Sequence, residues 1–259
     1  MRRIIFSIFL FSNFLISFCK AETGYLLNID GAIGPVTYYQ VKNVISLAKK
    51  NNADFVLITI DTPGGLLSST RKIVQEILSS DVPVVCYVYP SGAQCASAGT
   101  FIALASHILA MAPATNIGAA HPVTLTGGGE TESKMEEKIV NDTVSFIKTI
   151  ARHRGRNEKW AERAVRESIS STEEEALKEK VIDLKAKNIN ELLEKLDKWE
   201  IMIKEKKVVL RTKNAQLKEA KPEFKDKLLQ FISDPNIAYL LLVIGIWGII
   251  LEFSHPGFG

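Results

Sequence analysis

Apolar runs typical of buried strands alternate with amphipathic helical patterns along the first two-thirds of this chain. The run over 55–60 is almost continuous and rich in β-branched residues, and the run over 82–89 is rich in Val and Tyr. Between them, residues 70–78 place apolar side chains at helical spacing. Strands that alternate with helices predict βαβ units, a mostly parallel sheet and right-handed crossovers. The sequence therefore predicts an α/β fold.

The remaining elements follow from the same two periodicities and from turn and capping signals. We expect a glycine-rich loop over 122–132, between a short strand and a long helix. Further strands are expected over 24–30, 108–111, 181–184 and 206–211, and further helices over 36–49, 98–105, 133–153, 160–166, from 171 or 172 onward, and 189–196.

The N-terminus has the pattern of a secretory signal peptide. Two arginines precede an apolar run over 4–18, and the small residues Cys19 and Ala21 follow it. This pattern predicts cleavage after Ala21, so that residues 1–21 are removed. A lipid-modified Cys19 and a retained N-terminal anchor are the alternatives.

A second apolar run near the C-terminus predicts a transmembrane helix over 231–253; a buried core helix is the alternative. Lysines just before this run would favour a cytoplasmic domain, but the signal peptide sets the opposite orientation. We therefore expect the α/β domain over 22–199 to be extracytoplasmic. A charged linker over 200–230 would connect it to the helix, and a short tail over 254–259 would follow.

Composition restricts the function classes. The chain has 259 residues and a formal net charge of only +3, without a basic patch interleaved with aromatics, so nucleic acid is not an expected partner. Cys86 and Cys95 would remain after cleavage, which is too few for a disulfide framework, although a bond between these two stays open.

Two turns rich in small residues follow neighbouring predicted strands. Ser97 lies among small residues just before the helix over 98–105, the position in which a nucleophile is presented at a strand-to-helix turn. Gly64 and Gly65 form the other turn. Backbone N–H groups of the Gly64-Gly65 pair and of Ala98 could form an oxyanion hole at the carboxyl edge of the sheet. Each turn taken alone is equally compatible with a structural role.

Several segments in order extend this interpretation, and together they resemble the NfeD family of membrane-bound serine proteases, the stomatin-operon partner proteins. That family is related to the Clp protease subunit and to signal-peptide peptidase A, within the Clp/crotonase fold. The resemblance covers residues 24–196 and extends into the apolar run. The segments that carry it are 61–65, 92–100, 116–122, 138–142, 155–157, 171–177 and 181–183.

The resemblance implies a Ser-Lys dyad, with Ser97 as the nucleophile and Lys138 as the general base. It implies the oxyanion hole at Gly65 and Ala98, and it requires no metal or organic cofactor. Without it, Lys138 would be interpreted as a surface lysine, since Asn141 and Asp142 lie one turn away.

Two other residues compete for roles near the site. Lys134 lies one turn before Lys138 on the same predicted helix. Among the histidines, only His121 is a serious candidate for a base, and we assign it, with Gly64, to a substrate groove.

The expected function is a membrane-anchored endopeptidase that cleaves a hydrophobic segment of a stomatin-like membrane protein. The family implies a homo-oligomer, dimeric or larger. Alternatives are a crotonase-like acyl-CoA enzyme and a non-catalytic scaffold for stomatin-type assemblies. Longer members of the family continue with further membrane helices and a small β-barrel, so this chain is expected to be a truncated or split version.

Overall fold

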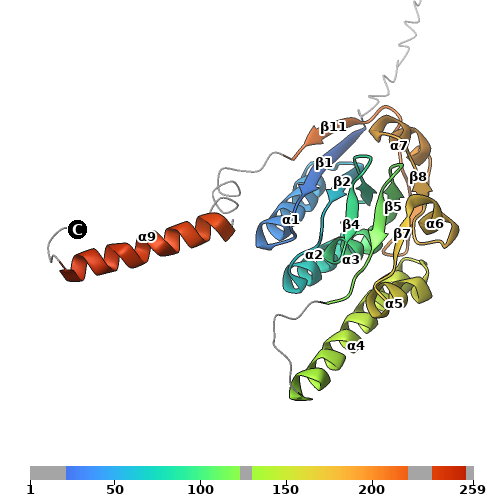
Figure 1. Ribbon diagram of the computed structural model, residues 1–259. Helices are drawn as coiled ribbons and strands as arrows, with labels where there is room; N and C mark the ends of the chain where they lie inside the picture. Colours follow the sequence, from blue (N-terminus) through green and yellow to red (C-terminus); the bar gives the residue numbers. More distant parts are fainter. Residues whose placement is uncertain (1–21, 123–129, 221–234, 255–259) are drawn as a thin grey trace, which may run out of the picture.

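A six-stranded parallel sheet forms the centre of the molecule (Figure 1). The computed structural model describes residues 22–122, 130–220 and 235–254. The strand order is β11-β1-β2-β3-β5-β8, and every neighbouring pair is parallel. The predicted α/β class with a parallel sheet is therefore confirmed. The strands are β1 (Thr23–Asp30), β2 (Phe55–Asp61), β3 (Val84–Val88), β5 (Ile108–Met111), β8 (Leu184–Lys185) and β11 (Gln216–Glu219).

Both faces of this sheet are buried, which explains why its central strands β2 and β3 are almost continuously apolar. Along β3, Cys86 faces one apolar core and Tyr87 faces the other. Helices α1, α2, α3, α4, α5 and α6 contribute to the first core, and α7 contributes to the second. The helices are α1 (Pro35–Lys50), α2 (Leu67–Ser79), α3 (Ala98–Ala105), α4 (Glu130–His153), α5 (Glu158–Arg166), α6 (Glu173–Lys178) and α7 (Ile189–Leu196).

A second, three-stranded sheet lies beyond the carboxyl end of β2. Its order is β4-β6-β7, with β4 and β6 parallel and β6 and β7 antiparallel. Thr62 donates its N–H to the Gln94 carbonyl and accepts from the Ala96 N–H, which joins β4 to the chain that leaves β2. This small sheet therefore brings the segment before Ser97 against the segment before Gly64. Its strands are β4 (Gln94–Ala96), β6 (Asn116–Gly118) and β7 (Ser170–Thr172).

The segment expected to be a charged linker over 200–230 contains three strands. β9 (Glu200–Ile203) and β10 (Lys206–Val209) form an antiparallel hairpin, and β11 adds to the main sheet beside β1. β10 corresponds to the strand expected over 206–211, whereas β9 and β11, with four residues each, were not predicted. Residues 221–230 lie outside the described residues.

Helix α9 (Pro235–Ser254) corresponds to most of the transmembrane helix predicted over 231–253. Its large apolar side chains are exposed, among them Leu241, Trp247 and Phe253. No helix within the described ranges is both long enough and apolar enough to span a membrane. The predicted signal peptide over 1–21 and tail residues 255–259 lie outside the described residues.

Candidate active site

Ser97 occupies the N-cap of α3 in a backbone conformation that L-residues rarely adopt. Its φ is 49° and its ψ is −114°. Its N–H donates to the carbonyls of Gly118 and Ala119, at 3.4 and 3.1 Å, and its carbonyl accepts from the Thr100 N–H at 3.0 Å. The surrounding strands therefore hold the residue in a strained turn, an arrangement common where a side chain must be presented for chemistry.

Gly64 lies directly against the Ser97 side chain. A Cβ built at Gly64 would come within 2.5 Å of the Ser97 Cβ and 2.9 Å of its Oγ, and φ of Gly64 is +121°. Two hydrogen bonds hold the glycine in place. Its N–H donates to Thr62 Oγ1 at 3.1 Å, and its carbonyl accepts from the Ile33 N–H at 2.8 Å.

The backbone of Ile33 determines where the Gly65 N–H points. Ile33 bonds to the carbonyl of Gly64 and to the N–H of Leu66, which is the pattern of a parallel bridge to Gly65. In such a bridge the N–H of the middle residue points away from its partner. A Cβ at Gly65 would lie 2.1 Å from the Ile33 carbonyl oxygen, so only glycine fits here.

Ala98 supplies a second backbone donor. It is the first residue of α3, where N–H groups have no acceptor within the helix and the helix dipole favours negative charge. Within the described part of the chain, neither the Gly65 N–H nor the Ala98 N–H donates a hydrogen bond. Two free donors beside a serine hydroxyl are the components of an oxyanion hole.

Cys86 and Cys95 are buried free thiols, so the structure places no disulfide between them. Burial raises the pKa of the Cys86 thiol to about 12 and raises the pKa of Cys95 well above its usual value. A buried thiol of this kind is not a nucleophile at neutral pH. Ser97 is therefore the nucleophile candidate of this turn, although Cys95 is only two residues away.

Lys138 is exposed on the N-terminal half of α4. It lines an open depression of about 490 Å³ with Lys134, Glu137, Asn141, Asp142 and Ser145. No hydrogen bond joins Lys138 to Ser97 among the residues that the structure describes. The structure thus brings together Ser97, Gly64, Gly65 and Ala98, and it leaves Lys138 on a separate element.

His121 is half-buried, and its Nδ1 lies 2.8 Å from the Val165 carbonyl oxygen. Because a carbonyl only accepts, Nδ1 is the donor in this contact. The histidine lies two residues beyond Ala119, whose carbonyl accepts from Ser97.

Several residues that support the Ser97 turn and the two glycines were not predicted from the sequence. Thr62 holds Gly64, Ile33 orients Gly65, and buried Thr100 donates its hydroxyl to the Cys95 carbonyl at 2.9 Å. A threonine after a predicted strand is a possible signal for Thr62. No local signal exists for Ile33, because it acts through its backbone from a different βα connection.

The chain matches the family of NfeD1b N-terminal domains over residues 23–221. It is 42% identical over 259 residues to a protein named membrane-bound protease PH1510 from Pyrococcus horikoshii, covering 99% of this chain and 59% of that protein. It is 27% identical over 243 residues to membrane protein NfeD1b of Bacillus subtilis (strain 168), covering 93% of this chain and 53% of that protein. The chain therefore spans somewhat more than half the length of these curated relatives.

Solved structures share the fold. One is described as the 1510-N membrane-bound stomatin-specific protease, K138A mutant, in complex with a substrate peptide; it has 40% identity and a TM-score of 0.74, covering 82% of this chain and 98% of that chain. The S97A mutant of the same protease has 38% identity and a TM-score of 0.72, covering 78% and 99%. The resemblance to NfeD proteins is thereby confirmed, and the chain belongs to the NfeD1b N-terminal domain family.

Proposed function

We propose that this chain is a membrane-associated serine endopeptidase with Ser97 as its nucleophile and Lys138 as its general base. One observation carries the proposal: the free N–H groups of Gly65 and Ala98 flank a serine held in a strained turn. The solved relatives support the dyad, because their substituted positions bear the numbers of Ser97 and Lys138 in this chain and one of them holds a substrate peptide.

In the acylation step, Ser97 Oγ attacks the carbonyl carbon of the scissile peptide while a neutral Lys138 Nζ takes the hydroxyl proton. The carbonyl oxygen becomes an oxyanion, to which Gly65 and Ala98 donate their N–H groups. When the C–N bond breaks, the Lys138 ammonium returns the proton to the leaving amine. A water molecule, deprotonated by the now neutral Lys138 amine, then hydrolyses the Ser97 ester.

This chemistry requires Lys138 Nζ at hydrogen-bond distance from Ser97 Oγ. Catalytic hydrogen bonds are often long in free enzymes and form fully only with substrate. The polar contacts that tie α4 to neighbouring helices involve Asn141, Asp142, Lys148 and Arg152, all beyond Lys138. We infer that the turns of α4 around Lys138 approach the Ser97 turn in the catalytic state.

The substrate we propose is a hydrophobic segment of a stomatin-like membrane protein. The solved relatives are described as stomatin-specific, which supports this class of partner. Leu66, next to Gly65, is 55% exposed and offers an apolar contact beside the oxyanion hole. We place Gly64 and His121 along the same groove, because both belong to segments bonded to or packed against the Ser97 turn.

We propose further that α9 associates the protein with the membrane and that the protease domain is extracytoplasmic. The exposed apolar side chains of α9 and the membrane-bound relatives support membrane association, and the predicted signal peptide supports the orientation. A homo-oligomer is also part of the proposal. If the transmembrane helix predicted from the sequence over 231–253 forms, a reporter fused after Gly259 is expected to be cytoplasmic, and an extracytoplasmic reporter would contradict that prediction.

The test is cleavage of a fluorogenic apolar peptide by the full chain in detergent. Ser97→Ala and Lys138→Ala are expected to reduce the rate to background. Lys134→Ala is the matched control, since it removes a lysine from the same face one helical turn earlier, and it should retain at least a third of the wild-type rate. Full activity of Lys138→Ala would overturn the dyad.

The same preparation separates the alternative functions. If the wild type cleaves no stomatin-like protein while Ser97→Ala binds it as tightly as the wild type, the chain is a scaffold. Turnover of an acyl thioester without peptide cleavage would indicate the acyl-CoA enzyme.

A further inference from the structure

The nearest polar neighbours of Lys138 on its own helix are Asn141 and Asp142, three and four residues later. Side chains at these spacings lie on the same face of a helix, and a lysine and an aspartate four residues apart ordinarily form an ion pair. Both neighbours line the same open depression as Lys138. A salt bridge within α4 is therefore the default expectation for this lysine.

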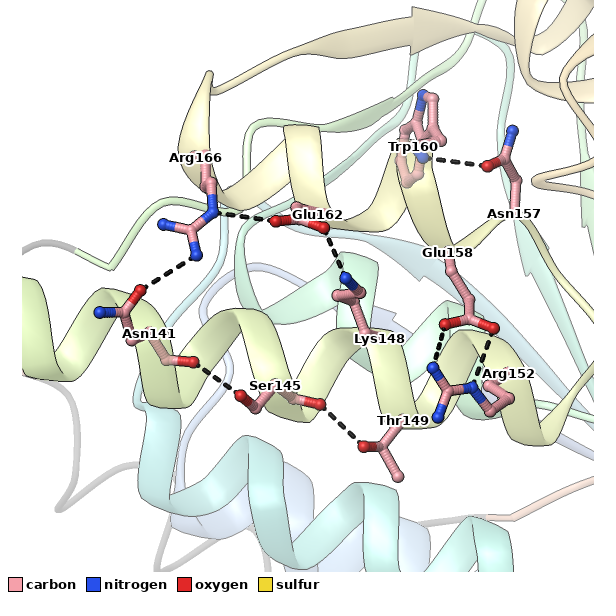
Figure 2. A network of polar contacts seen from close by, with 10 residues as sticks. All are labelled: Asn141, Ser145, Lys148, Thr149, Arg152, Asn157, Glu158, Trp160, Glu162 and Arg166. Carbon is pink, nitrogen blue, oxygen red and sulfur yellow. Dashed lines mark hydrogen bonds and ion pairs between the residues drawn. The ribbon is translucent and has the colours of Figure 1, made fainter.

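The structure shows a different arrangement, because arginines from two other helices occupy both neighbours. Arg71 of α2 donates to Asp142 Oδ2 at 2.5 Å. Arg166 of α5 donates to Asn141 Oδ1 at 3.0 Å, as Figure 2 shows. Lys138 forms no ion pair with any carboxylate among the described residues.

Each arginine is held in place by a second contact. The Arg71 guanidinium lies 4.2 Å from the centroid of the Phe146 ring, which in turn stacks on Phe101 of α3. Arg166 donates through Nε to Glu162 of its own helix at 3.0 Å. The two arginines are thus anchored to the packed body of the domain.

The charges around Lys138 follow from this arrangement. On α4, Lys134 lies one turn away with the same charge, and Glu137, adjacent in sequence, lines the same depression. From the packed helices come Arg71 of α2 and Arg166 and Glu162 of α5, while α3 carries no ionisable side chain. Because Asp142 is paired to Arg71, the carboxylate at ion-pair spacing on α4 is already occupied by a residue of another helix.

We propose that Arg71 is a positioning residue that withholds Asp142 from Lys138 and docks α4 onto α2. The proposal rests on the proposed function, in which Lys138 must be neutral to accept the Ser97 proton. Arg71 lies only six residues after Gly65, so the same contact sets the position of the Lys138 helix relative to the oxyanion hole. Without Arg71, Asp142 is free to pair with Lys138, which stabilises the ammonium form and draws it along the helix.

The test compares pH profiles of kcat/KM for peptide cleavage by the full chain. In Arg71→Leu, the acidic limb is expected to move about 0.5 to 1 unit toward alkaline pH, the size of shift that one new, solvent-screened carboxylate partner produces. At a fixed pH on the acidic limb, activity would then fall about threefold to tenfold and would recover at higher pH. Arg71→Lys should keep most of the wild-type profile, since it retains the positive charge.

The double variant Arg71→Leu/Asp142→Asn distinguishes an effect of the Asp142 charge on Lys138 from a general loss of stability. It removes the carboxylate as well, so the acidic limb should return to the wild-type position. Arg152→Leu is the matched control, because it breaks an exposed arginine–carboxylate pair on the last turn of α4, visible in Figure 2, and should leave the profile unchanged. A pH-independent loss that Asp142→Asn does not rescue would overturn the proposal, as would an unchanged profile in Arg71→Leu.

Lys138→Ala in the same assay distinguishes this failure from failure of the proposed function. If Lys138→Ala is inactive and Arg71→Leu behaves as wild type, only the role of Arg71 is wrong. If Lys138→Ala cleaves as well as wild type, the dyad itself is wrong.

Discussion

Gly64 and Ser97 pack so closely that no side chain fits between them: a Cβ on Gly64 would lie 2.5 Å from that of Ser97. Their segments come from different strands, β2 and β4, joined through Thr62. The contact fixes the serine hydroxyl relative to the next residue, Gly65, whose N–H is free. The candidate nucleophile and the candidate oxyanion hole therefore form a single packed unit.

Gly64→Ala is expected to reduce kcat of peptide cleavage at least a hundredfold, because the methyl group must displace the Ser97 side chain. Gly31→Ala is the matched control. Gly31 also has a positive φ, +95°, but a Cβ there meets nothing within 4 Å. Gly31→Ala should lose a similar amount of stability through backbone strain but keep its activity. Equal losses of activity in both variants would contradict the packing argument.

Ser97→Gly is expected to raise the free energy of unfolding by about 1–2 kcal/mol, because glycine adopts a φ of 49° and a ψ of −114° without steric cost. Ser97→Ala keeps the Cβ and should leave stability close to wild type, while both variants lose activity. Urea denaturation of all three proteins measures the difference. Equal stability of Ser97→Gly and Ser97→Ala would show that the turn stores no strain.

Stability is expected to fall as pH decreases below about 6.5. Burial, with the nearby Arg154 and Arg156, lowers the pKa of His107 to about 3, and its Nδ1 accepts a hydrogen bond from the Val84 N–H. Between pH 6.5 and 3 the unfolded chain binds a proton that the folded chain does not. The free energy of unfolding should therefore drop by about 2 kcal/mol between pH 7 and pH 5.

Denaturation with urea at both pH values measures that slope. His107→Asn keeps an acceptor for Val84 but cannot titrate, so it should flatten the dependence on pH. The exposed His153 provides the control, and His153→Asn should leave the wild-type slope intact. A slope that persists in His107→Asn would assign the titration to another group.

Asp183→Asn is expected to lower the free energy of unfolding by about 3 kcal/mol, because it leaves a buried guanidinium without its counter-charge. Arg156 is 3% exposed and donates to Asp183 Oδ2 at 2.7 Å and to the carbonyls of Leu104 and Ser106. Urea denaturation of Glu167→Gln, which breaks the exposed pair with Arg163, should show no measurable change.

The sequence predicts clearly bounded or uniformly apolar elements well and three-residue strands poorly. The helix over 98–105 and the strand over 108–111 match α3 and β5 residue for residue, because one is bounded by small residues and the other is uniformly apolar. Strands β4, β6 and β7 have three residues each and were not predicted. Their pairing depends on contacts between residues that are distant in sequence, and the periodicity of a single segment does not indicate such contacts.

The candidate site likewise contains some residues that the sequence predicts and others that it does not. The positions of Ser97, Gly65 and Ala98 follow from two turns at the carboxyl ends of neighbouring strands, which a parallel sheet must bring together. Lys138 has no such local signal, and its role depends on resemblance and remains a proposal. The contribution of Ile33 could not be predicted from the sequence, since its hydrogen bonds depend on where a separate connection crosses the sheet edge.

The pairing of β11 with β1 determines the direction in which the chain leaves the folded domain. Because β11 runs parallel to β1 and β2, the chain leaves it heading toward the carboxyl edge of the sheet, the edge that carries Ser97. The chain thus reaches Ala220 at the end of β11 on the side of the domain that carries Ser97. Under the proposed function, the membrane-associated part of the chain is therefore attached at the same edge of the sheet as the candidate nucleophile.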